Sequence, residues 1–186
     1  MKVLGIVGSP HNEGHTAKLV EAVIAGVISA GHIADIFYLS DMEIGPIQAS
    51  GGVLEYPQDD MARLYPHLET MDALVLGTPI YYDHVSSRTK LFIDRLHYYS
   101  RTHGEEYRRR FPDGVKAVTV ITQGAGNPDR YDYVLEWMKG RLEHYWNMEV
   151  VASLKAESTG RDPVEKREDL LERGREIGRG LINQSG

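Results

Sequence analysis

The amino-acid sequence predicts an α/β fold, in which parallel strands form a central sheet and helices cover it. Apolar runs of strand length alternate with segments of helical period, which is typical of successive βαβ units. The chain has 186 residues, 41% of them hydrophobic and 26% charged, and these values fit one domain (residues 1–186) with a sizeable core. No repeat, low-complexity tract or linker interrupts the alternation.

The first strand and helix are predicted at residues 2–7 and 16–30. The helical segment places its apolar side chains on one side, and Gly31 ends it. Residues 32–39 alternate apolar and polar side chains, which suits a strand at the edge of a sheet. Residues 73–78 are almost wholly apolar, so we expect this strand at the centre of the sheet.

Three further elements continue the alternation: a helix over residues 85–100 and strands over residues 115–122 and 148–154. A helix follows each of the last two strands. The first is expected to open at Asn127 and Pro128. For the second, Asp162, Pro163 and Glu165 are predicted to serve as cap, first-turn proline and capping-box partner.

Two segments are longer than ordinary connections and do not fit the alternation. Residues 40–60 are rich in glycine and proline and are predicted to form a lid or a partner-facing loop. Residues 101–114 carry charges of both signs, including Arg108, Arg109 and Arg110. This run is either a solvated turn or a clamp for a phosphate on a second ligand.

The composition excludes several classes of chemistry. The sequence contains no cysteine, which rules out disulfides, thiolate nucleophiles, thiolate-bound zinc and cysteine-ligated iron–sulfur clusters within it. We therefore assign no metal site. With 27 acidic and 21 basic side chains the formal charge is -6 at pH 7, which disfavours a nucleic-acid-binding function. No signal sequence or membrane-spanning stretch is evident, so we expect a cytoplasmic protein without a membrane partner.

Ligands of open parallel sheets bind beyond the carboxyl ends of the strands, and the first strand ends in a loop suited to an anion. Its small and hydroxylic residues lead directly into a helix N-terminus, where backbone N–H groups and the helix dipole favour negative charge. The candidate phosphate-binding residues are Ser9, Pro10, His11, Asn12, Gly14, His15 and Thr16. The spacing differs from that of a P-loop, and His15 stands where the P-loop has lysine. The alternative is a capped turn that binds nothing.

The next two strand ends carry residues suited to a flat conjugated ring. Two adjacent tyrosines after the most apolar strand are predicted to form an aromatic wall, and a glycine-rich loop allows backbone to approach a ligand. The candidates are Pro79, Ile80, Tyr81, Tyr82 and Asp83 in one loop, and Thr122, Gln123, Gly124 and Gly126 in the other. Together with the anion loop, these residues predict a site for a mononucleotide with a large flat ring.

Two motifs carry a resemblance to a known family. The first is MKVLGIVGSP at residues 1–10 with Gly14 and Thr16, and the second is GTPIYY at residues 77–82 with Val85, Ser86, Lys90 and FIDR at residues 92–95. In this order they resemble the NAD(P)H-dependent FMN reductase and iron–sulfur flavoprotein group of the flavodoxin-like superfamily. The resemblance implies a flavodoxin-like three-layer sandwich with a five-stranded parallel sheet of order 2-1-3-4-5. It also implies FMN as cofactor and a homodimer or homotetramer.

The resemblance assigns roles to residues at all three loops. It implies that Ser9, Asn12, His15 and Thr16 hold the phosphate, that residues 79–82 line the isoalloxazine, and that residues 123–126 contact it. The chain also departs from the family. His11 and His15 replace arginine and asparagine, so phosphate affinity is expected to fall as pH rises, and Asp83 replaces a glycine. The cysteine motif of the iron–sulfur branch is replaced by a segment with Ile47, Ser50 and Val53.

The leading functional hypothesis is an FMN-dependent oxidoreductase that takes hydride from NADH or NADPH and reduces a quinone, a flavin or a similar small acceptor. The alternatives are an FMN electron carrier without turnover of its own and a flavin-free structural relative. No protein side chain is assigned a catalytic role, because the flavin would carry the chemistry. His84 and His97 are interpreted as structural, and Asp94 and Arg95 as members of local ion pairs.

Overall fold

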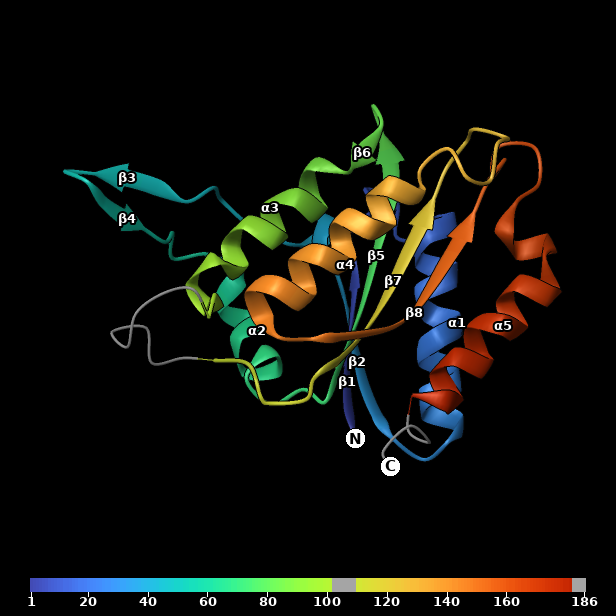
Figure 1. Cartoon of the computed structure of the whole chain (residues 1–186), viewed down its shortest axis with the longest axis horizontal. Helices are drawn as coiled ribbons and strands as arrows, with labels where there is room; N and C mark the ends of the chain where they lie inside the picture. The colour runs from blue at the N-terminus through green and yellow to red at the C-terminus, as the bar shows by residue number, and fades with distance from the viewer. Residues whose placement is uncertain (102–109, 182–186) are drawn as a thin grey trace.

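The computed structural model describes residues 1–101 and 110–181, and it contains the parallel sheet that the sequence predicts. Five parallel strands lie in the order β2-β1-β5-β7-β8, which is the predicted order 2-1-3-4-5 (Figure 1). The strands are β1 (Lys2–Val7), β2 (Ile33–Tyr38), β5 (Ala73–Tyr81), β7 (Lys116–Thr122) and β8 (Glu149–Ala156). As predicted, β2 is an edge strand with half-exposed side chains, and β5 is central and buried.

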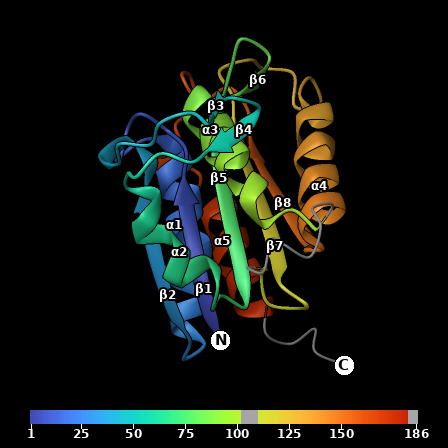
Figure 2. The ribbon, with the colours of Figure 1, turned by 90° about the vertical axis from the view of Figure 1, so that its left-hand side faces the viewer.

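Helices cover both faces of the sheet and bury two apolar cores. Helices α1 (His15–Ser29) and α5 (Glu168–Gly180) cover one face, whereas α2 (Met61–Leu68), α3 (Ser87–Arg95) and α4 (Asp132–Trp146) cover the other (Figures 1 and 2). Successive residues of β5 point into different cores: Leu74 and Leu76 into the core beneath α2, α3 and α4, and Val75 into the core beneath α1 and α5.

Helices α1 and α5 approach each other so closely that their backbones touch. A Cβ atom at Gly26 would overlap the carbonyl of Arg175, and one at Gly178 would overlap the carbonyl of Val23. Any larger residue at either position would therefore have to move one of the two helices.

The end of β5 differs from the prediction. The strand continues through Pro79 and Ile80 to Tyr81 instead of ending in a loop at Thr78, and it turns back into the short antiparallel strand β6 (His84–Val85). Helix α3 consequently starts only at Ser87. Ser86 is its N-cap, and its Oγ accepts the Thr89 N–H at 3.1 Å. The helix is followed directly by the 3₁₀ helix η2 (Leu96–Tyr99). The predicted helix over residues 85–100 is therefore two residues too long at its start.

The segment predicted as an irregular connection contains regular structure. After the 3₁₀ helix η1 (Leu39–Asp41), strands β3 (Gln48–Ser50) and β4 (Val53–Glu55) form an antiparallel hairpin, which we call the arm. The arm projects away from the rest of the fold on the side of α3 (Figure 1). Helix α2 follows it and was also missed. This helix is only eight residues long and contains Pro66, so its sequence signal is weak.

The predicted starts of the last two helices were also wrong. Asp162 and Pro163 precede the 3₁₀ helix η3 (Val164–Lys166), and α5 begins only after Arg167, whose non-helical backbone separates the two. Helix α4 begins at Asp132, well after Pro128.

Among the residues described, no helix is long and apolar enough to cross a membrane. The cytoplasmic location stays a prediction, and Arg108 and Arg109 lie outside the described residues.

Candidate functional site

The loops after β1 and β5 are joined by buried hydrogen bonds at the centre of the sheet. The Gly8 N–H donates to the Gly77 carbonyl at 2.8 Å, and the Ser86 hydroxyl donates to the Gly8 carbonyl at 2.6 Å. No side chain fits at Gly8, because a Cβ atom would overlap Thr89 Oγ1. This contact lies where the order of strands reverses along the chain, which is the usual ligand position in such sheets.

The loop after β1 is also joined to the end of β7. Thr16 and Thr122 are both buried, and their hydroxyl oxygens lie 2.7 Å apart. This contact joins the first turn of α1 to the last residue of β7. The expected convergence of the three strand ends is therefore present in the fold. A hydroxyl with one partner can still bond a further group, so the phosphate role of Thr16 stays a prediction.

The N-terminus of α1 has the properties of an anion site. Gly14 is the N-cap residue, no side chain caps the helix, and its first turn contains no acidic residue. The buried Ser9 hydroxyl accepts the His11 N–H at 3.1 Å and keeps its own proton available for a further acceptor. Backbone N–H groups at such a start have no intrahelical partner and favour negative charge.

The outer part of this loop faces η1 across an open depression of about 670 Å³. The Asn12 amide donates to Asp41 at 2.7 Å and accepts from the Ser40 hydroxyl, so the side chain is held toward η1. Pro10 and His11 are exposed at the rim. The phosphate role expected for Asn12 would therefore require its side chain to change partners.

His15 lies beside a loop that the sequence analysis did not include in the site. Its Nδ1 is 3.5 Å from the Glu165 carboxylate of η3. The contact places the His15 imidazole and the Glu165 carboxylate side by side at the first turn of α1. Glu165 was predicted to be a helix-capping residue, and nothing in its sequence position indicated a contact with the first loop.

The tip of the β5–β6 hairpin is held in an uncommon conformation. Tyr82 and Asp83 form its two-residue turn with φ of 47° and 66°, both in the left-handed region. Asp83, which stands where the family has glycine, therefore adopts a conformation that glycine reaches with less strain. Tyr82 is fully exposed and Tyr81 is about half exposed, so both rings are available at the surface.

Asp83 connects this tip to the start of α4. Its carboxylate accepts the Tyr131 hydroxyl at 2.7 Å and lies 3.6 Å from the Arg130 guanidinium, while its backbone carbonyl accepts the Tyr133 hydroxyl. The hydrogen bond to Asp83 raises the pKa of Tyr131. We call the contacts of Asp83 with Arg130, Tyr131 and Tyr133 the latch. Sequence reasoning missed it, because its members lie almost fifty residues apart along the chain.

The loop after β7 is shaped by Gln123 and by the last strand-end loop. The Gln123 side chain is buried and donates to the Asn127 carbonyl at 2.7 Å, while its backbone carbonyl accepts the Thr159 N–H at 3.1 Å. Gly126 faces Ser158, whereas the space beside Gly124 is open. Ser158 and Thr159 follow the last strand. Their hydroxyl groups at a strand end are a sequence signal that this fourth loop also belongs to the site, and the sequence prediction did not use it.

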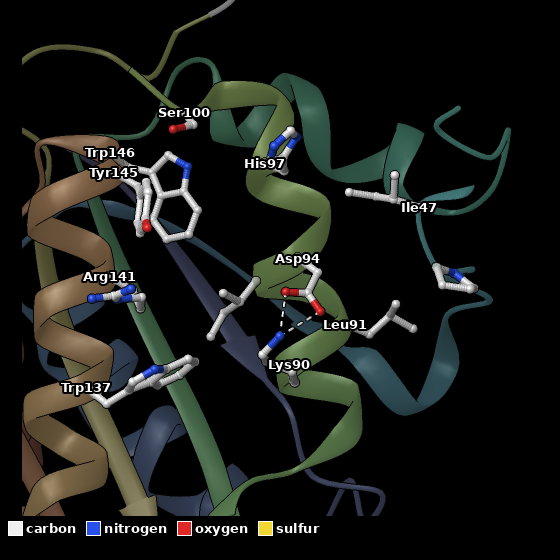
Figure 3. A pocket seen from close by; sticks show the side chains of 12 residues that line it. Ile47, Lys90, Leu91, Asp94, His97, Ser100, Trp137, Arg141, Tyr145 and Trp146 are labelled. Carbon is white, nitrogen blue, oxygen red and sulfur yellow. Dashed lines mark hydrogen bonds and ion pairs between the residues drawn. The ribbon is translucent and has the colours of Figure 1, made fainter. Parts of the chain in front are cut away.

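The structure thus brings most of the predicted residues to one edge of the sheet. The buried ones are Ser9, Thr16, Pro79, Thr122 and Gln123, and the partly buried ones are Gly14, His15 and Ile80. The exposed ones are Pro10, His11, Asn12, Tyr81, Tyr82, Asp83, Gly124 and Gly126. The described part of the chain also has a larger groove, of about 690 Å³, but it runs across α3 from α4 to Pro46 and Ile47, away from these loops (Figure 3).

Comparison with known proteins identifies the family of this chain. Residues 1–135 match the family model of NADPH-dependent FMN reductase. An iron–sulfur flavoprotein of Archaeoglobus fulgidus is 29% identical over 133 residues, covering 69% of this chain and 58% of the relative. YwqN of Bacillus subtilis, named as an NAD(P)H-dependent FMN-containing oxidoreductase, is 35% identical over 137 residues, covering 69% of each chain.

Solved structures show the same fold at lower identity. An NAD(P)H:quinone oxidoreductase from Methanothermobacter marburgensis superposes with a TM-score of 0.68 at 19% identity, over 97% of this chain and 96% of that one. The chain spans about half the length of several iron–sulfur flavoproteins that it matches. Its own 186 residues contain no cysteine with which to ligate a cluster.

Proposed function

We propose, on the premise that this chain belongs to the NADPH-dependent FMN reductase family, that it moves hydride from NADH or NADPH to a small acceptor such as a quinone or a free flavin. FMN is the cofactor of this proposal. The observation that carries it is the convergence of three strand-end loops, joined by buried hydrogen bonds, at the point where strand order reverses. One loop has donors for a phosphate and the others have aromatic and glycine residues for a ring.

The groups at α1 fit the phosphate of FMN. The helix offers uncapped backbone N–H groups, the Ser9 hydroxyl has a proton to donate, and no carboxylate lies in the first turn. The expected fall of phosphate affinity as pH rises stays a prediction, because the Glu165 carboxylate lies 3.5 Å from His15 Nδ1. This donor set suits a dianionic group better than a neutral one.

The other two loops suit the ring of FMN. Tyr81 and Tyr82 present aromatic surface at the end of β5, and the latch holds their hairpin against α4. The open space beside Gly124 lets a ligand approach the backbone of the third loop. Bound FMN would supply hydride transfer at its isoalloxazine, and the chain would supply binding, orientation and exclusion of water.

FMN binding is the first test of this proposal. Titration of FMN into the protein is expected to quench flavin fluorescence, and anaerobic NADH or NADPH is then expected to bleach the visible absorbance. A colourless protein that fails to quench FMN would contradict the proposal. Binding without a response to either nicotinamide would favour the electron-carrier alternative.

The phosphate assignment has a separate test in Ser9→Ala. Removing the hydroxyl is expected to weaken FMN by about 10- to 100-fold, the range for a hydrogen bond to a charged group, and to leave riboflavin affinity unchanged. Ser29→Ala is the matched control, because Ser29 bonds the Gly26 carbonyl in the last turn of the same helix. Equal losses for FMN and riboflavin would place the phosphate elsewhere. Thr16→Val is a poorer probe, because it also breaks the bond to Thr122.

A further inference from the structure

We propose that Ser86, the N-cap residue of α3, is a positioning residue for the anion loop, residues 8–16. Its hydroxyl holds the Gly8 carbonyl and thereby fixes the orientation of the peptide between Gly8 and Ser9. The inference rests on the proposed function, because it takes the phosphate of FMN as the ligand of this loop. It adds to that function a residue of a different element, which acts on the phosphate through the backbone of the loop.

Ser86 and the anion loop meet in a buried contact. The Ser86 side chain is buried, and its hydroxyl donates to the Gly8 carbonyl at 2.6 Å. The Gly8 N–H donates to the Gly77 carbonyl of β5 at 2.8 Å. Both backbone polar groups of Gly8 are therefore bonded to the segment that runs from β5 to the start of α3, one to its main chain and one to the Ser86 side chain.

The direction of each hydrogen bond around Ser86 follows from its partners. The Ser86 oxygen accepts the Thr89 N–H at 3.1 Å, whereas the Gly8 carbonyl oxygen can only accept, so the single proton of the Ser86 hydroxyl goes to Gly8. At the 3.0 Å contact between the Ser86 and Thr89 hydroxyls, Thr89 must consequently donate. The result is a chain of hydrogen bonds from Thr89 through Ser86 to Gly8, in which each bond strengthens the next.

The held carbonyl determines where the next N–H group points. In a planar trans peptide the C=O and N–H bonds point in opposite directions, so the Ser9 N–H points away from the Ser86 hydroxyl. Ser9 is buried, and its Oγ would lie 3.5 Å from a Cβ atom placed on Gly14, the N-cap residue of α1. Ser9 therefore lies beside the start of α1, which is where the phosphate is proposed to bind.

The N–H groups around this point have no acceptor in the protein. Within residues 1–101 and 110–181, the backbone N–H groups of Ser9, Thr16 and Ala17 bond to no acceptor, although all three residues are buried. Buried N–H groups without an acceptor are costly, and a phosphate can accept from several of them at once. If the Gly8 carbonyl were released, the same peptide could turn its oxygen toward the phosphate, whose charge would repel it. Ser86 therefore excludes the peptide orientation that opposes anion binding.

The first experiment compares the affinities of the wild type and Ser86→Gly for FMN and for riboflavin by fluorescence titration. Glycine is nearly as good an N-cap as serine, so this substitution removes the bond to Gly8 and keeps the start of α3. We expect FMN affinity to fall about 10-fold or more and riboflavin affinity to change less than about twofold, because only FMN carries the phosphate. Thr119→Val is the matched control, because it removes a buried hydroxyl that lies 2.7 Å from Ser153 Oγ within the sheet, and it should leave both affinities unchanged.

The conservative variant Ser86→Thr keeps the hydroxyl and should keep the preference for FMN over riboflavin. Equal losses of FMN and riboflavin affinity in Ser86→Gly, or no loss of FMN affinity, would overturn the inference and leave the proposed function standing. A wild type that does not bind FMN at all would contradict the proposed function and this inference together.

The second experiment observes the Ser9 amide directly by NMR of isotope-labelled protein. In the wild type, FMN is expected to move the Ser9 amide proton downfield, because its N–H gains a charged acceptor, and riboflavin is expected to leave it nearly unchanged. In Ser86→Gly the shift caused by FMN should be smaller, and the same spectra show that the variant is folded. An unchanged Ser9 signal in wild type saturated with FMN, or an identical shift in Ser86→Gly, would overturn the inference.

Discussion

The loops at the carboxyl edge of the sheet and the arm are both connections between regular elements, but they are held in different ways. Each strand-end loop is bonded to its neighbours through buried groups, such as Gly8 with Ser86 and Thr16 with Thr122. Among the described residues, the arm is held at its base by Arg95 and Asp59 and by the hydrogen bond between Tyr56 and His97, and the residues of its two strands are exposed. Preorganised loops suit a small ligand, whereas a stiffly mounted, uncovered hairpin suits a macromolecular surface.

Arg95→Met tests the base of the arm and has the largest expected effect. Removing the guanidinium leaves the Asp59 carboxylate, which is only 12% exposed, without its charged partner, which should lower the free energy of unfolding by about 3–5 kcal/mol in urea denaturation. Asp94→Asn is the neighbouring control, because it breaks only the exposed pair with Lys90 and should cost less than about 1 kcal/mol. Similar losses for the two variants would mean that the arm is not held as described.

The same pair should give stability a dependence on acid pH. Burial alone would raise the pKa of the Asp59 carboxyl, but hydrogen bonds from Arg95 and two backbone N–H groups outweigh it and lower the pKa. Stabilisation by a carboxyl with a lowered pKa is complete above its unfolded value of about 4 and is lost as pH falls through the folded value. The difference in unfolding free energy between the wild type and Arg95→Met should therefore be constant from pH 5 to pH 8 and become smaller below pH 4.

Gly8→Ala tests the strand-end loops and has the next largest expected effect. The added methyl would overlap Thr89 Oγ1 and force the first two loops apart, so we expect a loss of about 1–3 kcal/mol in unfolding free energy together with weaker FMN binding. Gly124→Ala is the control, because its methyl would enter open space in the third loop. Equal stability of the two variants would contradict the close contact at Gly8.

Substitutions in the latch should have the smallest effect, and FMN affinity is the quantity that measures it most directly. Asp83→Asn and Tyr131→Phe each weaken the bond between the hairpin tip and α4, so each should reduce affinity by about 2- to 10-fold, and the double variant should lose little more. The raised pKa of Tyr131 means that this bond stabilises the fold below pH 10 and is lost as pH rises further. The unfolding free energies of the wild type and Tyr131→Phe should therefore become more similar as pH rises above 10. Independent, additive losses would argue against a latch.

The sheet and most of the candidate site were predictable because their signals are local. An apolar run of strand length such as residues 73–78 indicates a buried strand, and the structure has one there. The three predicted loops do converge, and the individual site assignments stay predictions that FMN titration tests.

The contacts that were missed depend on residues far apart in the sequence. The arm has no alternating apolar pattern, and its register comes from the Gly51–Gly52 turn rather than from a buried face. Arg95 resembled a partner for its helical neighbours, yet burial beneath the segment after β4 selects Asp59 instead. Likewise, the choice of Thr122 as the partner of Thr16 follows from strand order, which no short stretch of sequence encodes.

Helix α1 connects the candidate site to a distant part of the molecule. Its N-terminus forms the anion loop, and near its other end Gly26 touches the backbone of α5. A helix of 15 residues is about 22 Å long and resists bending, so a displacement at one end is transmitted to the other. Variants selected for altered cofactor affinity should therefore include substitutions at Gly26 or Gly178, where inspection of the ligand's surroundings alone would give no reason to look.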